Sequence, residues 1–511
     1  MADHRGGGVL GVEEHAPMPD LAGLPGVASL APAEETEVDA TYVDTADLAL
    51  AEARITLSRR TGGAEPGWLL ELPTHDGRHT ERQPAEDDPA LVPARLRDLV
   101  QVVVRDQPLA PVARVCTRRT VHRLLDASGT VLAEVVDDRV TATTTDATGA
   151  TTRWREWRVR PVEGGRRLLG ALAELLEGAG AESAGGPAGG PAGGPAELAR
   201  ALGNQTPAGR EAPALAVDTP ASAVVRARLA EQVGALVRLD PLVRCDVPDA
   251  VHAMRVATRR LRSALATFRP LVDREATEPL RAEVRELGVL LGEARDTEVL
   301  ADLLRDVLDP EVAVVGGAEA RDHVLSDLRH RYARAHKHAV AALRSERYLQ
   351  LVDALQDLAA DAPLTVTAER PTDKVLRGRV RHDWERLADR VRALQDAEGP
   401  EERGRALHDV RKAAKRARYA AEPLVPAYGK DARRFVRRLE HIQSVLGEHH
   451  DLLVARAELP GLARRAAADG VDGYVLGVAH VRLEERTAAS EAAFEQAWRR
   501  ASAKKNLRWL P

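Results

Sequence analysis

The sequence predicts a multidomain protein: an N-terminal antiparallel β tunnel or barrel with flanking helices (α+β), followed by an all-α helical bundle made of two repeated units. Three observations support this. Residues 10–180 contain short β-branched segments separated by Gly, Pro and Asp. A run of Ala, Gly and Pro then interrupts the chain, and from about residue 215 apolar residues recur every three or four positions. We therefore expect a strand-rich domain at 1–180, a linker at 181–210 and a helical domain at 211–511.

The length and composition exclude several classes of protein. The 511 residues suffice for two or three domains that each bury a core. Cys116 and Cys245 are too far apart in the sequence to indicate a zinc site or a disulfide framework. The first ten residues lack the apolar stretch of a signal peptide, and no run approaches the roughly 20 apolar residues of a membrane span. We expect a cytoplasmic protein with no membrane partner.

The charge is unevenly distributed along the chain, although the formal net charge is only −5. Residues 1–210 contain 22 Lys and Arg against 31 Asp and Glu, a balance of −9. Residues 211–511 contain 51 against 47, a balance of +4, and eleven of the 16 histidines. Because a basic face attracts a polyanion whatever the net charge, the second half is where such a face is expected.

Six segments of the N-terminal domain are predicted strands: 41–44, 54–60, 68–72, 112–124, 131–140 and 154–162. The weak alternation of polar and apolar residues in 131–136 is typical of strands with both faces enclosed. Helices are predicted at 93–104 and 167–177. Together these elements indicate an antiparallel sheet that curls on itself, with helices outside.

The linker and the helices after it are predicted from composition and periodicity. The run AGGPAGGPAGGPA cannot bury enough surface to fold. Apolar stripes with the helical period, as in 284–291 and 436–446, indicate about eight to ten helices. Prolines such as Pro310 and Pro460 are expected at helix ends.

Two segments of the helical domain, 251–272 and 407–428, repeat one pattern of basic residues. At an offset of 156, the matched residues are His252 and His408, Arg255 and Arg411, Arg259 and Lys415, Arg260 and Arg416, and Arg262 and Arg418. The segments 291–296 (LGEARD) and 446–451 (LGEHHD) match at an offset of 155. We infer a duplicated unit of several helices.

The spacing of this pattern gathers its charges on one side of each helix. At 100° per residue, residues 252, 255, 259 and 262 fall within an arc of about 80° and extend about 15 Å along the axis. Like charges three and four residues apart destabilise an isolated helix, so the stripe needs counter-charges or an anionic ligand. Arginine binds phosphate oxygens bidentately. Two such stripes face to face would form a basic channel for an extended polyanion.

These helices resemble the CHAD family, the conserved histidine α-helical domain, over about residues 215–511. Members are two-copy helical bundles that bind inorganic polyphosphate along a basic face, and the resemblance implies the same fold and ligand here. The implied binding residues are His252, Arg255, Arg259, Arg260, Arg262, His408, Arg411, Lys412, Lys415, Arg416 and Arg418. A basic segment with Arg377, Arg381 and Arg386 is expected near the same face.

A purely structural role for the stripe is one alternative. Glu293, Asp296, Glu448 and Asp451 on the following helices could neutralise it as an ion-pair network. A solvated or neutralised face has no reason to keep His and Arg at the same offsets twice, so the repeat favours a ligand.

A metal-dependent phosphohydrolase is a second alternative, because His408, His449, His450 and Asp451 are suitable ligands for Zn, Mn or Fe. In the first copy Ala294 and Arg295 replace the adjacent histidines, and an arginine repels a metal ion. No metal site is predicted here.

The strand region resembles the CYTH family, the triphosphate tunnel metalloenzymes, through 40–45 (ATYVDT), 55–62 (ITLSRRTG), 68–73 (WLLELP) and 154–156 (WRE). The family holds a triphosphate with inward basic residues, and Mg²⁺ or Mn²⁺ with glutamates, inside a closed tunnel. This chain lacks the family's Glu-x-Glu-x-Lys motif, and Ser58 and Glu71 replace an inward Arg and Lys. The residual tunnel candidates are Arg60, Arg118, Glu134, Asp138 and Glu156.

These patterns predict a protein that binds inorganic polyphosphate through its helical domain and carries a catalytically inactive, degenerate tunnel domain. No cofactor is expected, and Mg²⁺ or Mn²⁺ enters only in the alternative, an active metal-dependent triphosphatase with a polyphosphate-binding accessory domain. Nucleic acid is not the expected polyanion, because 3% aromatic residues offer little base stacking. Association with polyphosphate granules is expected, and the sequence does not predict an oligomeric state.

Overall fold

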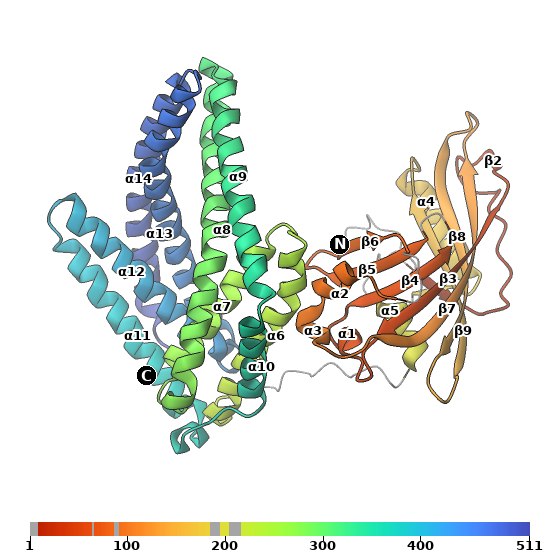
Figure 1. Ribbon diagram of the computed structural model, residues 1–511, viewed down its shortest axis with the longest axis horizontal. Coiled ribbons are helices and arrows are strands. Elements are labelled where there is room, and N and C mark those ends of the chain that lie inside the picture. Colours follow the sequence, from red (N-terminus) through yellow and green to blue (C-terminus); the bar gives the residue numbers. More distant parts are fainter. Residues whose placement is uncertain (1–8, 64–65, 86–90, 184–194, 204–215) are drawn as a thin grey trace. The chain divides into compact units, whose positions relative to one another are not determined.

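The computed structural model describes residues 9–63, 66–85, 91–183, 195–203 and 216–511 (Figure 1). The chain divides into two compact units, Met1–Arg210 and Glu211–Pro511. In the part of the chain that is described, no helix is long and apolar enough to cross a membrane.

Unit 1 is built on a ten-stranded antiparallel sheet with the order β10-β1-β9-β8-β7-β3-β4-β5-β6, and β2 pairs with β7. The strands are β1 (Val9–Val12), β2 (Ser29–Leu30), β3 (Glu34–Asp44), β4 (Thr56–Gly62), β5 (Gly67–Pro73), β6 (Arg78–Gln83), β7 (Ala110–Leu125), β8 (Val131–Thr144), β9 (Thr151–Pro161) and β10 (Glu182–Ser183). The helices are α1 (Ala49–Glu52), α2 (Ala94–Leu99), α3 (Gln101–Val104), α4 (Arg166–Gly178) and α5 (Pro195–Leu202). The predicted antiparallel sheet with flanking helices is confirmed. Among the described residues no ladder joins the end strands β6 and β10, so the hydrogen-bonded path is open.

The two faces of this sheet are covered by different helices. Residues paired directly across antiparallel strands lie on the same face. Ala133 and Val135 of β8 contribute to a core with Leu168 and Leu172 of α4. Residues one position along the strands, such as Val140, face the other side and pack with α5. The register therefore decides which charged residues lie beneath α5.

Helix α5 corrects the predicted linker at 181–210. Leu198, Ala201 and Leu202 are buried in a core with Tyr42 and Trp154 of the sheet, and β10 pairs with β1. The sequence Glu-Leu-Ala-Arg-Ala-Leu after the Gly/Pro run places apolar residues three and four apart, which is enough for a short amphipathic helix. The remaining linker residues, 184–194 and 204–210, lie outside the described residues.

Unit 2 is all-helical, as predicted. Its helices are α6 (Ala221–Arg244), α7 (Ala250–Thr267), α8 (Arg274–Val315), α9 (Ala318–Leu343), α10 (Glu346–Ala360), η2 (Val366–Glu369), α11 (Thr372–Gln395), α12 (Gly399–Ala421), η3 (Glu422–Leu424), α13 (Val425–Ala468), α14 (Tyr474–Ala501) and η4 (Lys504–Asn506). Pro310 and Pro460, expected at helix ends, lie inside α8 and α13. Each proline removes one backbone hydrogen bond, and burial of neighbours such as Leu308 and Leu459 offsets that loss.

The long helices of unit 2 form the frame around the site. Helices α8 and α9 run side by side, as do α13 and α14 (Figure 1). One apolar core joins α8, α9, α13 and α14 through residues such as Leu304, Leu328, Leu452 and Leu483. Outside this core, α7 packs on α8 and α12, while α13 packs on α8 and α12. The similar basic segments lie on α7 and α12; the two-unit repeat itself stays a prediction.

Candidate functional site

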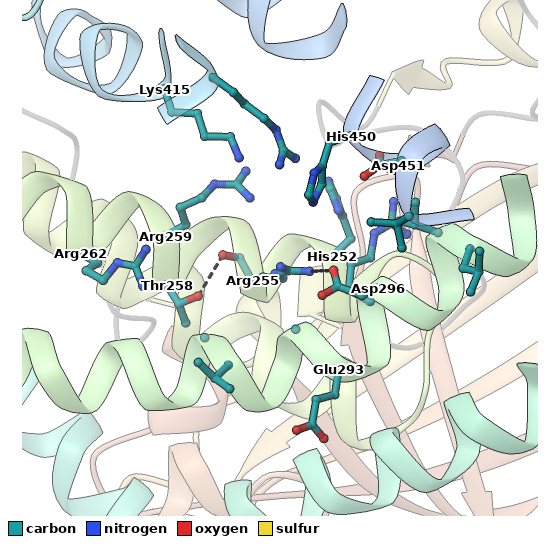
Figure 2. A pocket seen from close by; sticks show the side chains of 18 of the residues that line it. His252, Arg255, Thr258, Arg259, Arg262, Glu293, Asp296, Lys415, His450 and Asp451 are labelled. Atoms are coloured by element: carbon teal, nitrogen blue, oxygen red, sulfur yellow. Dashed lines mark hydrogen bonds and ion pairs between the residues drawn. The ribbon is translucent and has the colours of Figure 1, made fainter. Parts of the chain in front are cut away.

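Helices α7, α8, α12 and α13 surround a cavity of about 640 Å³ (Figure 2). Its charged and histidine lining residues are His252, Arg255, Arg259 and Arg262 from α7, Glu293, Arg295 and Asp296 from α8, Arg411 and Lys415 from α12, and His450 and Asp451 from α13. Six of these are Arg or Lys and three are Asp or Glu. The cavity therefore carries an excess of positive charge.

The amphipathic character of α7 directs its basic stripe into this cavity. Val251, Met254 and Leu261 are buried at 0–3% exposure, and the residues on the other side of the helix face the cavity. Burial of the apolar stripe fixes the rotation of the helix, so the charged stripe cannot turn away. The predicted arc of His252, Arg255, Arg259 and Arg262 thus lines one wall.

A tyrosine positions one of these arginines. Arg259 Nε donates a hydrogen bond to the Tyr419 hydroxyl on α12, with a distance of 2.7 Å. The Arg259 guanidinium carbon lies 5.9 Å from the centre of the same ring. Tyr419 is only 4% exposed, so the residue that orients Arg259 is itself held in the core. Figure 2 shows Arg259 and Lys415 reaching toward one another across the cavity.

Arg255 contacts a carboxylate across the wall of the cavity. Its Nη1 lies 2.5 Å from Asp296 Oδ1 on α8 (Figure 2). A Cβ at Gly292 would lie 3.5 Å from the Arg255 guanidinium carbon. Arg255 therefore lies flat on α8 over Gly292 and reaches the next turn of that helix.

The electrostatic field in the cavity disfavours further positive charge. Burial, followed by the charges of Arg411, Arg259 and Arg255, lowers the pKa of Lys415 to about 7. Burial and nearby basic residues also lower the pKa values of His252 and His450. These shifts have the direction that desolvation and like charges produce for a base.

For the carboxyl group of Asp451 in the cavity wall, burial shifts the pKa upward instead of downward. Burial raises the pKa of Asp451, and Asp296 raises it further, while Arg411 and Lys415 lower it. Burial also lowers the pKa values of Arg411 and Arg262. An anion bound between these side chains would supply the charge that the cavity lacks.

A second cavity, of about 670 Å³, adjoins the first through a shared histidine. His450 lines both cavities. The second one is also lined by Arg405, His408 and Lys412 of α12, and the His408 and His450 ring centres are 5.9 Å apart. Lys412 lies 2.7 Å from Asp409. The His408 pKa is lowered, first by burial and then by Lys412 and other basic neighbours.

Comparison with known proteins identifies the helical unit. Residues 227–460 match the CHAD domain. The chain contains a CHAD domain. It is 36% identical over 481 residues to the Mycobacterium tuberculosis proteins MT2285 and Rv2226, both described as uncharacterized, with 91% of this chain and 90% of each relative covered.

Two solved structures are similar to this chain. PptA from Streptomyces chartreusis is 26% identical, with a TM-score of 0.46, covering 55% of this chain and 100% of that one. The CHAD domain from the plant Ricinus communis is 26% identical, with a TM-score of 0.45, covering 57% of this chain and 95% of that one.

The predicted binding residues of the CHAD domain separate into two groups. His252, Arg255, Arg259, Arg262, Arg411 and Lys415 line the main cavity, and His408 and Lys412 line the adjoining one. Arg260, Arg416, Arg418, Arg377 and Arg381 line neither cavity. Their guanidinium groups contact carboxylates elsewhere in the domain.

Glu422 forms ion pairs with two of the arginines that line neither cavity, Arg260 and Arg418. Its carboxylate lies 2.9 Å from Arg418 Nε, 3.5 Å from Arg260 Nε and 2.6 Å from Arg228 Nη2. The side chains of Glu422, Arg418 and Arg228 are all at most 12% exposed. These residues form a buried ion-pair network that connects α6, α7 and α12.

The other three predicted binding arginines outside the cavities form ion pairs with carboxylates of α11. Arg416 Nε lies 2.7 Å from Asp383 Oδ1, whose side chain is buried. Arg377 Nε lies 3.1 Å from Asp373, and Arg381 Nε lies 2.8 Å from Glu385. Arg386 is exposed on α11 and lines neither cavity.

Sequence reasoning missed two cavity residues as ligand contacts, Arg295 and His450. The signal was present, because Arg295 and His450 are matched positions in the LGEARD and LGEHHD segments. One of the four residues considered as metal ligands, His449, lies away from the other three. It is 5% exposed, and its Nδ1 lies 2.8 Å from the Ser490 hydroxyl of α14. His449 and His450 therefore face different sides of α13.

In unit 1 the register places four of the five tunnel candidates on the sheet face that α5 packs against. The paired positions Ala40–Arg60, Asp138–Glu156 and Glu134–Arg160 put Arg60, Glu134, Asp138 and Glu156 on one face. Arg118 is exposed on the opposite face. Its neighbour Arg119 pairs with Asp138 and occupies the inward position, because side chains alternate along a strand.

The carboxylates on that face are already neutralised by arginines. Asp138 accepts from Arg119 Nε at 2.7 Å, Glu134 accepts from Arg123 Nε at 3.0 Å, and Glu156 accepts from Arg200 of α5 at 3.4 Å. Mg²⁺ and Mn²⁺ need several carboxylate oxygens turned toward one point. The donors present here do not fit such an ion.

Proposed function

We propose that the CHAD domain binds inorganic polyphosphate in the cavity between α7, α8, α12 and α13 and does not hydrolyse it. The observation that carries the proposal is the charge balance of the lining, with six Arg or Lys against three Asp or Glu. Arg forks bind phosphate oxygens bidentately, and Lys adds a point charge. Because polyphosphate would be its ligand, we also propose that the protein associates with polyphosphate granules.

Several of the cavity cations lack an acidic partner. Arg262, Arg411 and Lys415 form no ion pair within the described residues, and all three are at least partly buried. Buried charges are costly unless they are paired. A phosphate chain would supply the missing counter-charges, with one negative charge on each phosphate.

The lining favours an inorganic polyanion over a nucleic acid. Among the described residues no Phe, Tyr or Trp lines the cavity. Base stacking on aromatic rings is the main source of affinity for single strands. We therefore propose polyphosphate as the partner and neither a nucleic acid nor a membrane.

For unit 1 we propose a degenerate CYTH-like sheet without triphosphatase activity and without a cofactor. Ser58 and Glu71 are buried at 1% and 2% exposure where the resemblance implies an inward Arg and Lys. Glu71 accepts a hydrogen bond from Thr56 and lies 3.3 Å from Arg78. A carboxylate at that position repels phosphate.

Charge reversal in the cavity tests the binding proposal. Arg255→Glu together with Arg411→Glu should abolish binding of long-chain polyphosphate by the full chain, measured by calorimetry or gel shift, with unchanged far-UV circular dichroism. Arg499→Glu with Arg500→Glu is the matched control, because both residues are exposed on α14 and outside the cavities. Unchanged binding in the cavity variant would exclude this site.

Phosphate release separates the binder from the enzyme. The full chain should release no phosphate from tripolyphosphate with Mg²⁺ or Mn²⁺. Release that disappears in Glu134→Gln would overturn this part of the proposal in favour of an active triphosphatase.

A further inference from the structure

One surface of the helical domain is strongly basic and lies apart from the cavity. Residues 329–338 of α9 read RHRYARAHKH and contain no acidic residue. Arg329, His330, Arg334, Lys337 and His338 are all exposed, and we call them the α9 basic face. At 100° and 1.5 Å per residue they share one half of the helix and extend about 14 Å along it.

The opposite half of α9 fixes the orientation of this face. Tyr332 donates a hydrogen bond to Asp246 Oδ1 at 2.6 Å, and His336 Nε2 lies 2.7 Å from the Val243 carbonyl oxygen. The two rings are stacked with centres 5.8 Å apart. Arg331 Nη1 lies 3.1 Å from Glu458 of α13. These contacts hold the helix, so the basic face points to solvent.

The cations of the α9 basic face lack acidic partners. Within the described residues Arg329, Arg334 and Lys337 form no ion pair. Exposed arginines on neighbouring helices do, as Arg305 with Asp302 at 2.6 Å and Arg482 with Glu311 at 2.8 Å. A row of unpaired like charges on one helix destabilises it slightly, and an external anion would remove that cost.

We propose that the α9 basic face is a second contact surface for a linear inorganic polyanion, namely a further stretch of the polyphosphate chain held in the cavity. This inference rests on the proposed function. Helix α9 packs against α8, the helix that contributes Arg295 and Asp296 to the cavity wall. A chain too long for the cavity would therefore find a second set of cations one helix away.

The chemistry of the face favours a phosphate chain over a protein or a nucleic acid. Protein interfaces depend on buried aromatic or apolar anchors, and Ala333 is the one apolar residue exposed among 329–338. Single-stranded nucleic acids need stacking rings, and Tyr332 is engaged with Asp246 and His336. Exposed cations spread over about 14 Å of one helix match a flexible chain with a charge on every phosphate.

Chain length separates this surface from the cavity in an experiment. The full chain carries Arg329→Ala, Arg334→Ala and Lys337→Ala, and its affinity for tripolyphosphate and for long-chain polyphosphate is measured. The affinity for long-chain polyphosphate should fall about tenfold. The slope of log affinity against log salt concentration should become smaller in magnitude by about 2. Tripolyphosphate, which is too short to reach both surfaces, should bind within about twofold of the wild type. The matched control replaces Arg499, Arg500 and Lys504, which are exposed elsewhere.

The outcomes distinguish the two proposals. If the wild type binds neither probe, the proposed function fails. If it binds long-chain polyphosphate and the α9 variant binds it equally well, or loses no more than the control variant, the proposed function stands and this inference is overturned. Loss of RNA binding with unchanged polyphosphate binding would overturn it as well, in favour of a nucleic acid.

Discussion

Lys415 should couple polyphosphate binding to proton uptake. Its pKa is about 7, because of burial and the charges of Arg411, Arg259 and Arg255. In the free protein the ammonium group therefore loses its proton as the pH rises through about 7. A phosphate chain beside Lys415 stabilises the charged form and returns the pKa toward its ordinary range near 10. Affinity should then fall as the pH rises above 7.

The expected size of this effect follows from the two pKa values. With a pKa of about 7 in the free protein and of about 10 in the complex, affinity falls about 15-fold between pH 7.0 and pH 8.5, or roughly 1.6 kcal/mol. His252 and His450 have lowered pKa values in the free protein, and a bound phosphate raises them toward the ordinary histidine value as well. Because that ordinary value of about 6.5 lies below this pH range, the two histidines contribute less to the pH dependence than Lys415 does. Lys415 is the principal group that changes its charge there.

Calorimetry at constant ionic strength measures this coupling. Long-chain polyphosphate is the suitable probe, because its internal phosphates stay ionised between pH 7.0 and pH 8.5. Proton uptake appears as a difference in binding enthalpy between buffers with different ionisation enthalpies. Lys415→Met should flatten the pH dependence, and Lys412→Met, an exposed lysine on the same helix, should keep it. A Lys415→Met protein with the pH slope of the wild type would refute the reasoning.

Two further predictions concern buried carboxylates. Glu422→Gln should lower the free energy of unfolding of the helical unit by about 2 kcal/mol, because it removes the carboxylate that Arg228 and Arg418 share and leaves each with one partly exposed partner, Glu231 or Glu440; chemical denaturation measures this, and a loss below 1 kcal/mol would contradict it. Burial raises the pKa of Glu197 on α5 to about 7, so α5 should dock about tenfold less tightly at pH 8 than at pH 6, roughly 1.4 kcal/mol. Hydrogen exchange of the α5 amides, corrected for intrinsic rates, should show this difference, and Glu197→Gln should remove it.

The helix rotation in the CHAD domain was predictable from the sequence, but the partners of individual arginines were not. The arc of His252, Arg255, Arg259 and Arg262 follows from helical period alone, and all four line the cavity. Arg260 lies about 100° away from Arg259 and turns to Glu422. The family resemblance grouped it with the others, although the arc did not include it.

Arg418 shows where periodicity is insufficient. It occupies the position that matches Arg262, yet it lies 2.9 Å from Glu422 and 2.9 Å from Glu440. Glu422 comes within reach because the chain continues into η3 after α12, and Arg228 of α6 lies on its other side. Glu422 is four residues after Arg418, so helical spacing could have indicated that pair. Glu440 of α13 and Arg228 of α6 are tertiary neighbours, which spacing within one helix could not reveal.

In unit 1 the predicted inward arginine of β7 was wrong by one position, because Arg119 and not Arg118 pairs with Asp138. The sequence pattern could not distinguish Arg118 from Arg119 as the inward side chain, and a register change of one position moves a side chain to the other face. Helix α5 was not predicted, because its six helix-forming residues follow a long Gly/Pro run that led us to assign the segment to a linker. Its docking is tertiary, through Leu198 and Leu202 in the sheet core.

The two units use arginine in opposite ways, and this difference bears on function. On the sheet face that α5 packs against, Asp138, Glu134 and Glu156 each accept from an arginine, so these three tunnel candidates are charge-paired within the described residues. In the CHAD cavity, Arg411 and Lys415 are buried without carboxylate partners in the described chain, and their pKa values are lowered as a result. That electrostatic cost lowers the stability of the free domain. An anion that removes the cost recovers the same free energy as binding affinity, so affinity for a polyanion is a consequence of leaving these cations unpaired.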